Sequence, residues 1–271
     1  MSGPILVFDS GVGGLSVAAA IRQRLPQASL AYVCDNAMLP YGTKRDAWLV
    51  ARCVTVCEAA VAASGACALV VACNTASTLA LEALRARLQI PVVGTVPAIK
   101  PAAALSRSGH LALLATSATV NRPYTRRLIE TFAGHCQVQR LAADPLVAQA
   151  EHWLAGAALD PSIIDACLAP LWQDPELDTV VLGCTHFPLL GEALAAAAPR
   201  PVTWVDSGDA IARRVAQVVS PLPAMAGPQT AWLTRAAPLL APALARFGFA
   251  HARYLALDDS ADIASLTSPA P

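Results

Sequence analysis

The sequence has few charges, few aromatic residues and almost no lysine. Of its 271 residues, 14% are charged and 5% are aromatic, and the 19 basic residues balance the 19 acidic ones. Because nucleic-acid binding needs an excess of positive charge, we expect no nucleic-acid partner. The hydrophobic share of 55% is too high for a disordered chain. Much of that share is alanine, which favours helices and is only weakly hydrophobic.

The usual marks of metal and cofactor sites are also missing. The eight cysteines include no pair with the Cys-x-x-Cys spacing of zinc sites, and no His-Glu-x-x-His motif occurs. The glycine-rich turn Asp9–Gly14 does not match the dinucleotide-binding pattern Gly-x-Gly-x-x-Gly. Lysine occurs only at positions 44 and 100, and Lys100 has no phosphate-binding loop beside it, which argues against pyridoxal phosphate. We therefore expect no metal and no cofactor.

No segment resembles an export signal or a membrane anchor. The start of the chain has no basic region, and Asp9 interrupts its first apolar run. The uncharged stretch Ala59–Leu81 is long enough to span a membrane, but it contains several hydroxyl and amide residues and much alanine. We expect a cytoplasmic protein with reduced thiols and no membrane association.

Short apolar runs alternate with helical segments along most of the chain. Helices are predicted at Leu15–Leu25, Arg45–Ser64, Ser77–Leu88 and Leu239–Phe247. The predicted strands are Ile5–Phe8, Leu30–Val33, Ala68–Ala72, Ile90–Val93, Leu111–Ala115, Val138–Leu141, Thr179–Leu182, Thr203–Val205 and Ala231–Thr234. This alternation predicts an α/β fold with parallel sheets covered by helices on both faces. In such sheets, ligands bind at the carboxyl ends of the strands.

Two short patterns occur twice. Val70-Val-Ala-Cys73-Asn-Thr resembles Val180-Val-Leu-Gly-Cys184-Thr, and Val7-Phe-Asp9-Ser-Gly resembles Trp204-Val-Asp206-Ser-Gly. Each is an apolar strand that ends in polar residues. Either these matches are coincidental, or the chain has two similar α/β halves whose polar strand ends meet at a shared cleft.

Cys73 and Cys184 stand out because each lies at the end of a predicted strand and is followed by polar residues. A thiol at that position is close to the next helix N-terminus, which can lower its pKa from about 8.5. His186, two residues after Cys184, is either a proton relay for that thiol or a structural residue. Five other cysteines lie in alanine-rich or irregular stretches without polar neighbours and are expected to be packing residues: Cys53, Cys57, Cys67, Cys136 and Cys167.

Two further segments suit substrate binding. The turn Asp9–Gly14 lies between a strand and a helix, where the helix N-terminus favours an anion such as a small carboxylate. Because Asp9 would repel an anion, we expect the substrate to carry an ammonium group as well. The segment Pro40–Lys44 is either a ligand-binding loop or an ordinary surface turn.

Taken together, these motifs resemble those of bacterial glutamate racemases, in the aspartate/glutamate racemase family. The resemblance covers residues 4–258 and rests on segments in the family's order: Asp9–Ser16, Pro40–Lys44, Ala72–Ala76, Pro97–Pro101, Leu114–Thr116 with Thr119, Val181–Leu189 and Asp206–Gly208. It implies a cofactor-independent isomerase that interconverts L- and D-glutamate and supplies D-glutamate for peptidoglycan, and so for cell-wall biogenesis and cell shape. The implied partner is a small-molecule substrate, and a homodimer is the oligomer expected.

The resemblance also implies a domain organisation. The family fold has two similar α/β domains with parallel sheets, related by a pseudo-twofold axis, with the active site in the cleft between them. The first, discontinuous domain is expected at residues 1–97 plus 209–258, and the second at 98–208. Residues 259–271 are expected to be a disordered tail.

The functional residues follow from the same resemblance. The two catalytic thiols correspond to Cys73 and Cys184, and we expect Asp9 and His186 to assist them in proton transfer. Glu151 matches an auxiliary acid of the family, in a stretch with no sharp motif. The substrate-binding residues implied are Asp9, Ser10, Tyr41, Gly42, Asn74, Thr75, Thr185 and His186.

Three other functions compete with this one. An aspartate or hydantoin racemase of the same superfamily would share the paired cysteines. A non-catalytic carboxylate-binding protein on the same fold would not need both thiols. A thiol redox protein would need the two sulfurs close enough to bond, which a substrate held between them prevents.

The first prediction is that racemisation needs no cofactor. Exhaustive dialysis of the protein against a chelator, under reducing conditions, should leave the rate of glutamate racemisation unchanged. The measurement is the circular dichroism of D-glutamate incubated with the dialysed protein. A loss of activity that pyridoxal phosphate or a divalent metal restores would contradict the prediction.

Overall fold

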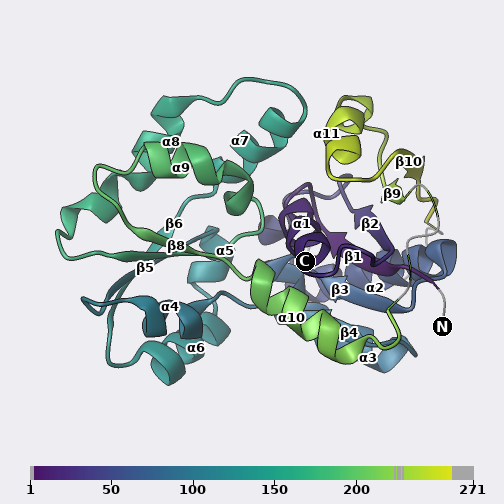
Figure 1. Cartoon of the computed structure of the whole chain (residues 1–271), viewed down its shortest axis with the longest axis horizontal. Helices are drawn as coiled ribbons and strands as arrows, with labels where there is room; N and C mark the ends of the chain where they lie inside the picture. The colour runs from purple at the N-terminus through teal and green to yellow at the C-terminus, as the bar shows by residue number, and fades with distance from the viewer. Residues whose placement is uncertain (1–2, 223, 225–226, 228, 258–271) are drawn as a thin grey trace, which may run out of the picture.

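The structure is a computed structural model that describes residues 3–222, 224, 227 and 229–257. Its named strands form two parallel sheets, one in each of the two lobes seen in Figure 1. The six-stranded sheet has the order β10-β9-β2-β1-β3-β4. Its strands are β1 (Ile5–Asp9), β2 (Leu30–Cys34), β3 (Ala68–Val71), β4 (Val92–Gly94), β9 (Thr230–Leu233) and β10 (His251–Tyr254). The four-stranded sheet has the order β6-β5-β7-β8, with β5 (His110–Ala115), β6 (Gln137–Ala142), β7 (Thr179–Leu182) and β8 (Thr203–Val205).

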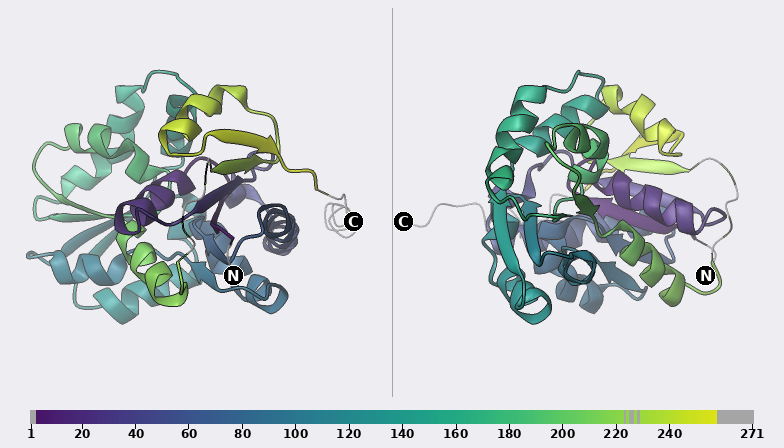
Figure 2. Two further views of the ribbon diagram at one scale, coloured as in Figure 1. Left: turned by 45° about the vertical axis from the view of Figure 1, so that its right-hand side comes forward. Right: turned by 60° about the vertical axis from the view of Figure 1, so that its left-hand side comes forward.

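Helices cover both faces of each sheet (Figures 1 and 2). Those beside the six-stranded sheet are α1 (Gly14–Arg24), α2 (Asp46–Ser64), α3 (Asn74–Arg87), α10 (Gly208–Val218) and α11 (Ala241–Arg246). Those beside the four-stranded sheet are α4 (Ile99–Leu105), α5 (Ser117–Val120), α6 (Pro123–Ala133), α7 (Pro145–Leu154), α8 (Pro161–Leu168) and α9 (Gly191–Ala196). Short 3-10 helices are η1 (Tyr41–Thr43), η2 (Ala169–Gln173), η3 (Phe187–Leu190) and η4 (Pro238–Leu240).

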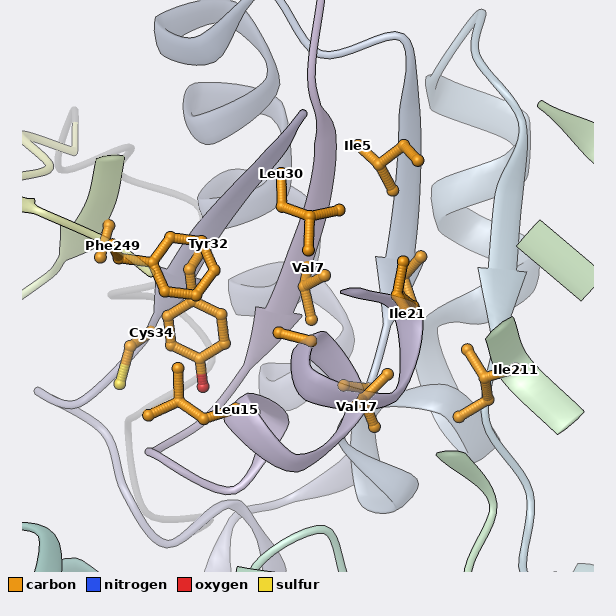
Figure 3. Close-up of a cluster of buried hydrophobic side chains, with 14 of the residues drawn as sticks. Ile5, Val7, Leu15, Val17, Ile21, Leu30, Tyr32, Cys34, Ile211 and Phe249 are labelled. Atoms are coloured by element: carbon orange, nitrogen blue, oxygen red, sulfur yellow. The ribbon is translucent and has the colours of Figure 1, made fainter. Parts of the chain in front are cut away.

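Alternating side chains of the central strands fill cores on the two faces of each sheet. In β1, Ile5 and Val7 pack in one buried cluster with Ile21 of α1 and Ile211 of α10, which Figure 3 shows in close-up. Leu6 and Phe8 point the other way, into a cluster that includes residues of α2 and α3. The four-stranded sheet has the same pattern, with one cluster shared with α7, α8 and α9 and another shared with α4, α5 and α6. Burial on both faces explains why the strands are continuous apolar runs.

These observations confirm the predicted α/β fold with two parallel sheets. They also explain one of the two repeated patterns. The strand order β2-β1-β3-β4 in the first sheet corresponds to β6-β5-β7-β8 in the second, so β3 is equivalent to β7. Cys73 and Cys184 therefore follow equivalent strands. The second repeat pairs β1 with β8, which are not equivalent in this order, so that match is coincidental.

Three local expectations were inaccurate. Helix α3 begins at Asn74 rather than Ser77, because Cys73 takes the extended backbone of an N-cap residue. Proline at position 242 lies at the start of α11, so the predicted helix Leu239–Phe247 is divided into η4 and α11. Strand β10 was not predicted, because its residues are exposed and mostly polar. The expected tail at 259–271 lies outside the described residues.

The uncharged stretch Ala59–Leu81 is not one helix, since it contains the end of α2, all of β3 and part of α3. Among the described helices, α2 is long and apolar enough to span a membrane. Its residues Leu49, Cys53 and Val56 are fully buried in the cluster shared with β1. That packing is typical of a core helix in an α/β fold.

Candidate active site

A cavity lies where the carboxyl ends of the two sheets' strands meet. Loops that follow β1, β2 and β3 form one side of it, and loops that follow β5 and β7 form the other. The lining residues are Ser10, Leu39, Pro40, Tyr41, Gly42, Cys73, Asn74, Thr75, Thr116, Thr119, Val147, Gly183, Cys184, Thr185 and His186. The structure thus brings together both strand-end cysteines and every substrate-binding residue expected from the sequence except Asp9.

Cys73 lies in a dry environment at the N-terminus of α3. It is 6% exposed, and its Sγ is 3.7 Å from Ser10 Oγ. Burial and the charge of Asp9 raise the pKa of the Cys73 thiol to about 12, although hydrogen bonds from the Ala76 amide and from Ser10 act in the opposite direction. Cys73 is therefore a neutral thiol at physiological pH, suited to donating a proton.

Cys184 is connected to a histidine and a carboxylate. Its Sγ is 3.7 Å from His186 Nδ1, and His186 Nε2 is 2.7 Å from Glu151 Oε1. Burial alone lowers the pKa of His186, but its hydrogen bonds to Cys184 and Glu151 raise that pKa well above its usual value. His186 is thus held as an imidazolium, which can exchange a proton with the sulfur. The side chain of Glu151 lies behind His186 rather than in the cavity wall.

Asp9 lies beneath the cavity and is fully buried. Its Oδ1 accepts hydrogen bonds from the Gly11 amide at 3.0 Å and from Ser10 Oγ at 3.4 Å, and its Oδ2 accepts one from Thr185 Oγ1 at 2.9 Å. Burial raises the pKa of Asp9, against the opposing effects of His186 and of the hydrogen bonds from Gly11 and Thr185. Asp9 contacts two wall residues, Ser10 and Thr185, but it does not itself line the cavity.

The glycine-rich turn after β1 is filled by the protein's own carboxylate. Glu151 Oε1 accepts a hydrogen bond from the Val12 amide at 2.8 Å, next to the N-terminus of α1. A Cβ on Gly11 would lie 2.1 Å from that oxygen, and a Cβ on Gly13 would lie 2.4 Å from Thr185 Oγ1. These glycines therefore allow close contact between the two halves. Glu151 thus occupies the anion-binding position at the Val12 amide, whereas Ser10 of the same turn lines the cavity.

Two wall residues differ sharply in their free hydrogen-bonding capacity. Asn74 Oδ1 is buried in the wall and has no hydrogen-bond partner among the described residues. A buried acceptor of this kind suits an ammonium donor, because leaving it unpaired is costly. The hydroxyl of Tyr41, in contrast, already donates to Asp35 at 2.7 Å.

Six wall residues were not among the site residues expected from the sequence: Leu39, Pro40, Thr116, Thr119, Val147 and Gly183. Thr116 follows β5, which is equivalent to β1. Its position directly after a strand end could therefore have predicted it as a wall residue. Thr119 lies one turn further along, and the two hydroxyls are 3.2 Å apart. Leu39 and Val147 are apolar, and nothing in their sequence surroundings distinguishes them from core residues.

The described residues contain no group of three or more His, Cys, Asp or Glu side chains that could hold a metal ion. All eight cysteines lie in the described part of the chain, and all are free thiols.

Comparisons with known proteins agree with this architecture. The family model described as Asp/Glu/Hydantoin racemase matches residues 15–215. A glutamate racemase of Shewanella loihica is 52% identical over 82% of this chain and 83% of its own, and one of Shewanella oneidensis is 54% identical over 79% and 78%. The crystal structure of Escherichia coli glutamate racemase, in complex with L-glutamate and the activator UDP-MurNAc-ala, is 44% identical. It superposes with a TM-score of 0.90 and covers 94% of this chain and 99% of that one.

The two parallel sheets whose strand ends meet at one cavity are the fold of glutamate racemase structures. With a family match over most of its length and relatives at about half identity, the chain belongs to the Asp/Glu/hydantoin racemase family.

The protonation of His186 can be tested with Glu151→Gln, which keeps an oxygen for the Val12 amide and removes the charge. We expect the pKa of His186, followed by NMR titration of the imidazole, to fall in the variant. Because the pKa of His186 is higher in the folded state than in the unfolded state, its protonation stabilises the fold. This contribution is complete below the unfolded-state pKa near 6.5 and is lost once the pH exceeds the folded-state pKa. The stability difference between wild type and variant should therefore shrink as pH rises through that window.

His110 provides an internal control. A hydrogen bond to Asp174 raises its pKa, and Glu151 is not among the causes of that shift. Its titration should be the same in both proteins. An unchanged pKa of His186 in Glu151→Gln would contradict the assignment.

Proposed function

We propose that this protein is a glutamate racemase, an isomerase of class EC 5.1.1.3, that interconverts L- and D-glutamate with two cysteines. The observation that carries the proposal is that Cys73 and Cys184 follow equivalent strands of the two sheets and line the same cavity. The similar proteins from Shewanella and Escherichia coli are glutamate racemases. D-glutamate made by such an enzyme is a peptidoglycan precursor, so the proposal includes a role in cell-wall synthesis in the cytoplasm.

Inversion of the α-carbon needs a base on one face and an acid on the other. From L-glutamate, the Cys184 thiolate takes the α-proton, with the His186 imidazolium 3.7 Å from its sulfur. The electron pair of the broken C–H bond stays on the α-carbon as a carbanion. The Cys73 thiol then gives its proton to the opposite face, which forms D-glutamate and leaves Cys184 protonated and Cys73 as a thiolate. From D-glutamate the roles are exchanged.

The wall residues suit an amino acid with two carboxylates. The unpaired Oδ1 of Asn74 accepts from the α-ammonium group. The hydroxyls of Thr75 and Thr116, with backbone amides of the Tyr41–Gly42 loop, are donors for the carboxylates, whereas the Thr185 hydroxyl already donates to Asp9. Asp9 accepts hydrogen bonds from Ser10 and Thr185 beneath the cavity, so we assign it the role of orienting these two wall residues.

The expected domain boundaries belong to the same proposal. Strands β1–β4, β9 and β10 form one sheet and strands β5–β8 the other, and α10 is a neighbour of α1. This supports a first domain of residues 1–97 plus 209–258 and a second domain of residues 98–208. The homodimer stays a prediction.

Replacing either thiol should depress both directions of the reaction. The equilibrium constant between enantiomers is one, so kcat/KM must be equal in both directions for every variant. Cys73→Ser and Cys184→Ser should each lower it on the order of 10²–10⁴-fold, since a hydroxyl is a far weaker acid than a thiol. Circular dichroism started from each enantiomer measures the rates, and in D₂O the wild-type product should carry deuterium at the α-carbon.

Cys167→Ser is the matched control, because Cys167 is partly exposed beside the four-stranded sheet and outside the cavity wall. It should retain the wild-type rate. Near-normal racemisation by Cys73→Ser or Cys184→Ser would end the two-base assignment, and an inactive wild type would end the proposed function.

Substrate length distinguishes this proposal from an aspartate racemase. The donors for the side-chain carboxylate lie at a fixed distance from the two thiols, and aspartate is one methylene shorter. Those donors would then be unpaired, so we expect kcat/KM for aspartate to be lower by at least about tenfold. Comparable values for the two amino acids would instead favour a racemase of broad specificity.

A further inference from the structure

A buried carboxylate, Asp35, lies behind the loop that carries part of the cavity wall. It follows β2 and is fully buried. Its Oδ2 accepts hydrogen bonds from the Tyr41 hydroxyl at 2.7 Å and from Arg52 Nε at 2.9 Å. Its Oδ1 accepts from Arg52 Nη2 at 2.8 Å and from Thr234 Oγ1 at 2.7 Å. One carboxylate thus joins the wall loop, helix α2 and the segment after β9.

Tyr41 is the member of this network that reaches the cavity. It is 2% exposed, and its ring packs against Phe8 with the centroids 6.2 Å apart. Burial, with the nearby Cys53 and Asp35, raises the pKa of Tyr41 well above its usual value, so its hydroxyl is a constant donor to Asp35. Because that hydroxyl is committed to Asp35, Tyr41 presents its ring and backbone to the cavity.

The segment after β9 also holds the start of the wall loop. Thr234 Oγ1 accepts a hydrogen bond from the Ala37 amide at 3.1 Å. The side chain of Asn36 accepts from the Arg235 amide at 3.0 Å and donates to the Arg235 carbonyl at 2.8 Å. Residues 36 and 37 are therefore fastened to residues 234 and 235, just before the wall residues Leu39–Gly42.

We propose that Asp35, Arg52 and Thr234 are positioning residues for substrate binding, which act by fixing Tyr41 and the wall loop. None of the three lines the cavity, so they act through the loop rather than by touching the ligand. If the loop is released from this network, it must become ordered when substrate binds. The free energy needed to order it weakens substrate binding. This inference rests on the proposed function and assigns a role to Thr234, in the segment that follows β9.

The test is Thr234→Val, which keeps the shape of the side chain and removes both the donor to Asp35 and the acceptor for the Ala37 amide. We expect KM to rise about tenfold for both enantiomers, the size of effect that loss of one hydrogen bond to a charged group produces. Because the thiols are untouched, kcat should stay within about threefold of wild type. Thr234→Ser, which keeps the hydroxyl, should restore the wild-type KM.

Two further variants sharpen the result. Thr230→Val makes the same substitution at the other end of β9 and should leave KM unchanged. Tyr41→Phe removes the hydroxyl and keeps the ring, so it should raise KM in the same way as Thr234→Val. Both changes act through Asp35. The fold-increase in KM of the double variant should therefore be smaller than the product of the fold-increases of the two single variants.

The outcomes separate this inference from the proposed function. An inactive wild type would overturn both. An active wild type whose KM is unchanged in Thr234→Val and in Tyr41→Phe would overturn the inference alone. A purely structural role would lower the melting temperature and the active fraction without changing KM, which would also overturn it. If Thr234→Val fails to fold, Tyr41→Phe with Thr234→Ser provides the same comparison.

Discussion

The carboxylate of Glu151 connects the two halves of the site. One of its oxygens accepts from the Val12 amide of the first sheet's loop and contacts His186 beside the second sheet's thiol. No side chain fits between them, since a Cβ on Gly11 would lie 2.1 Å from that oxygen. A second carboxylate, Asp9, joins Gly11 to Thr185. These contacts bring the two thiols to the same cavity.

The two thiols have equivalent positions but different surroundings. Cys73 follows β3, the third strand in the order β2-β1-β3-β4, and Cys184 follows β7, the third strand in the equivalent order β6-β5-β7-β8. Cys73 caps a long helix and is buried near Asp9, which favours the neutral thiol. Cys184 is followed by His186, whose hydrogen bonds to Cys184 and Glu151 raise its pKa well above the usual value, although burial acts in the opposite direction. This difference suits a reaction that needs one acid and one base, although the two thiols follow equivalent strands.

Much of the fold was predictable from the sequence. Apolar runs such as Ala68–Val71 and Thr179–Leu182 are strands because both faces of their sheets are covered, and Cys73 and Cys184 follow their carboxyl ends. The prediction failed where that signal is missing. Strand β10 is exposed and depends on pairing with β9, and the start of α3 depends on the backbone of Cys73.

The sequence by itself determined strands β1 to β9, the first three helices, and the two cysteines with His186 at strand ends, because periodicity and neighbouring residues carry that information. Only the tertiary structure decided what depends on residues far apart in the chain. It buried Asp9 beneath the cavity, placed Glu151 at the N-terminus of α1, and joined Thr234 to Asp35. The physical reason is that hydrogen bonding and burial of a polar side chain depend on which segments pack against it, and local sequence does not specify that packing.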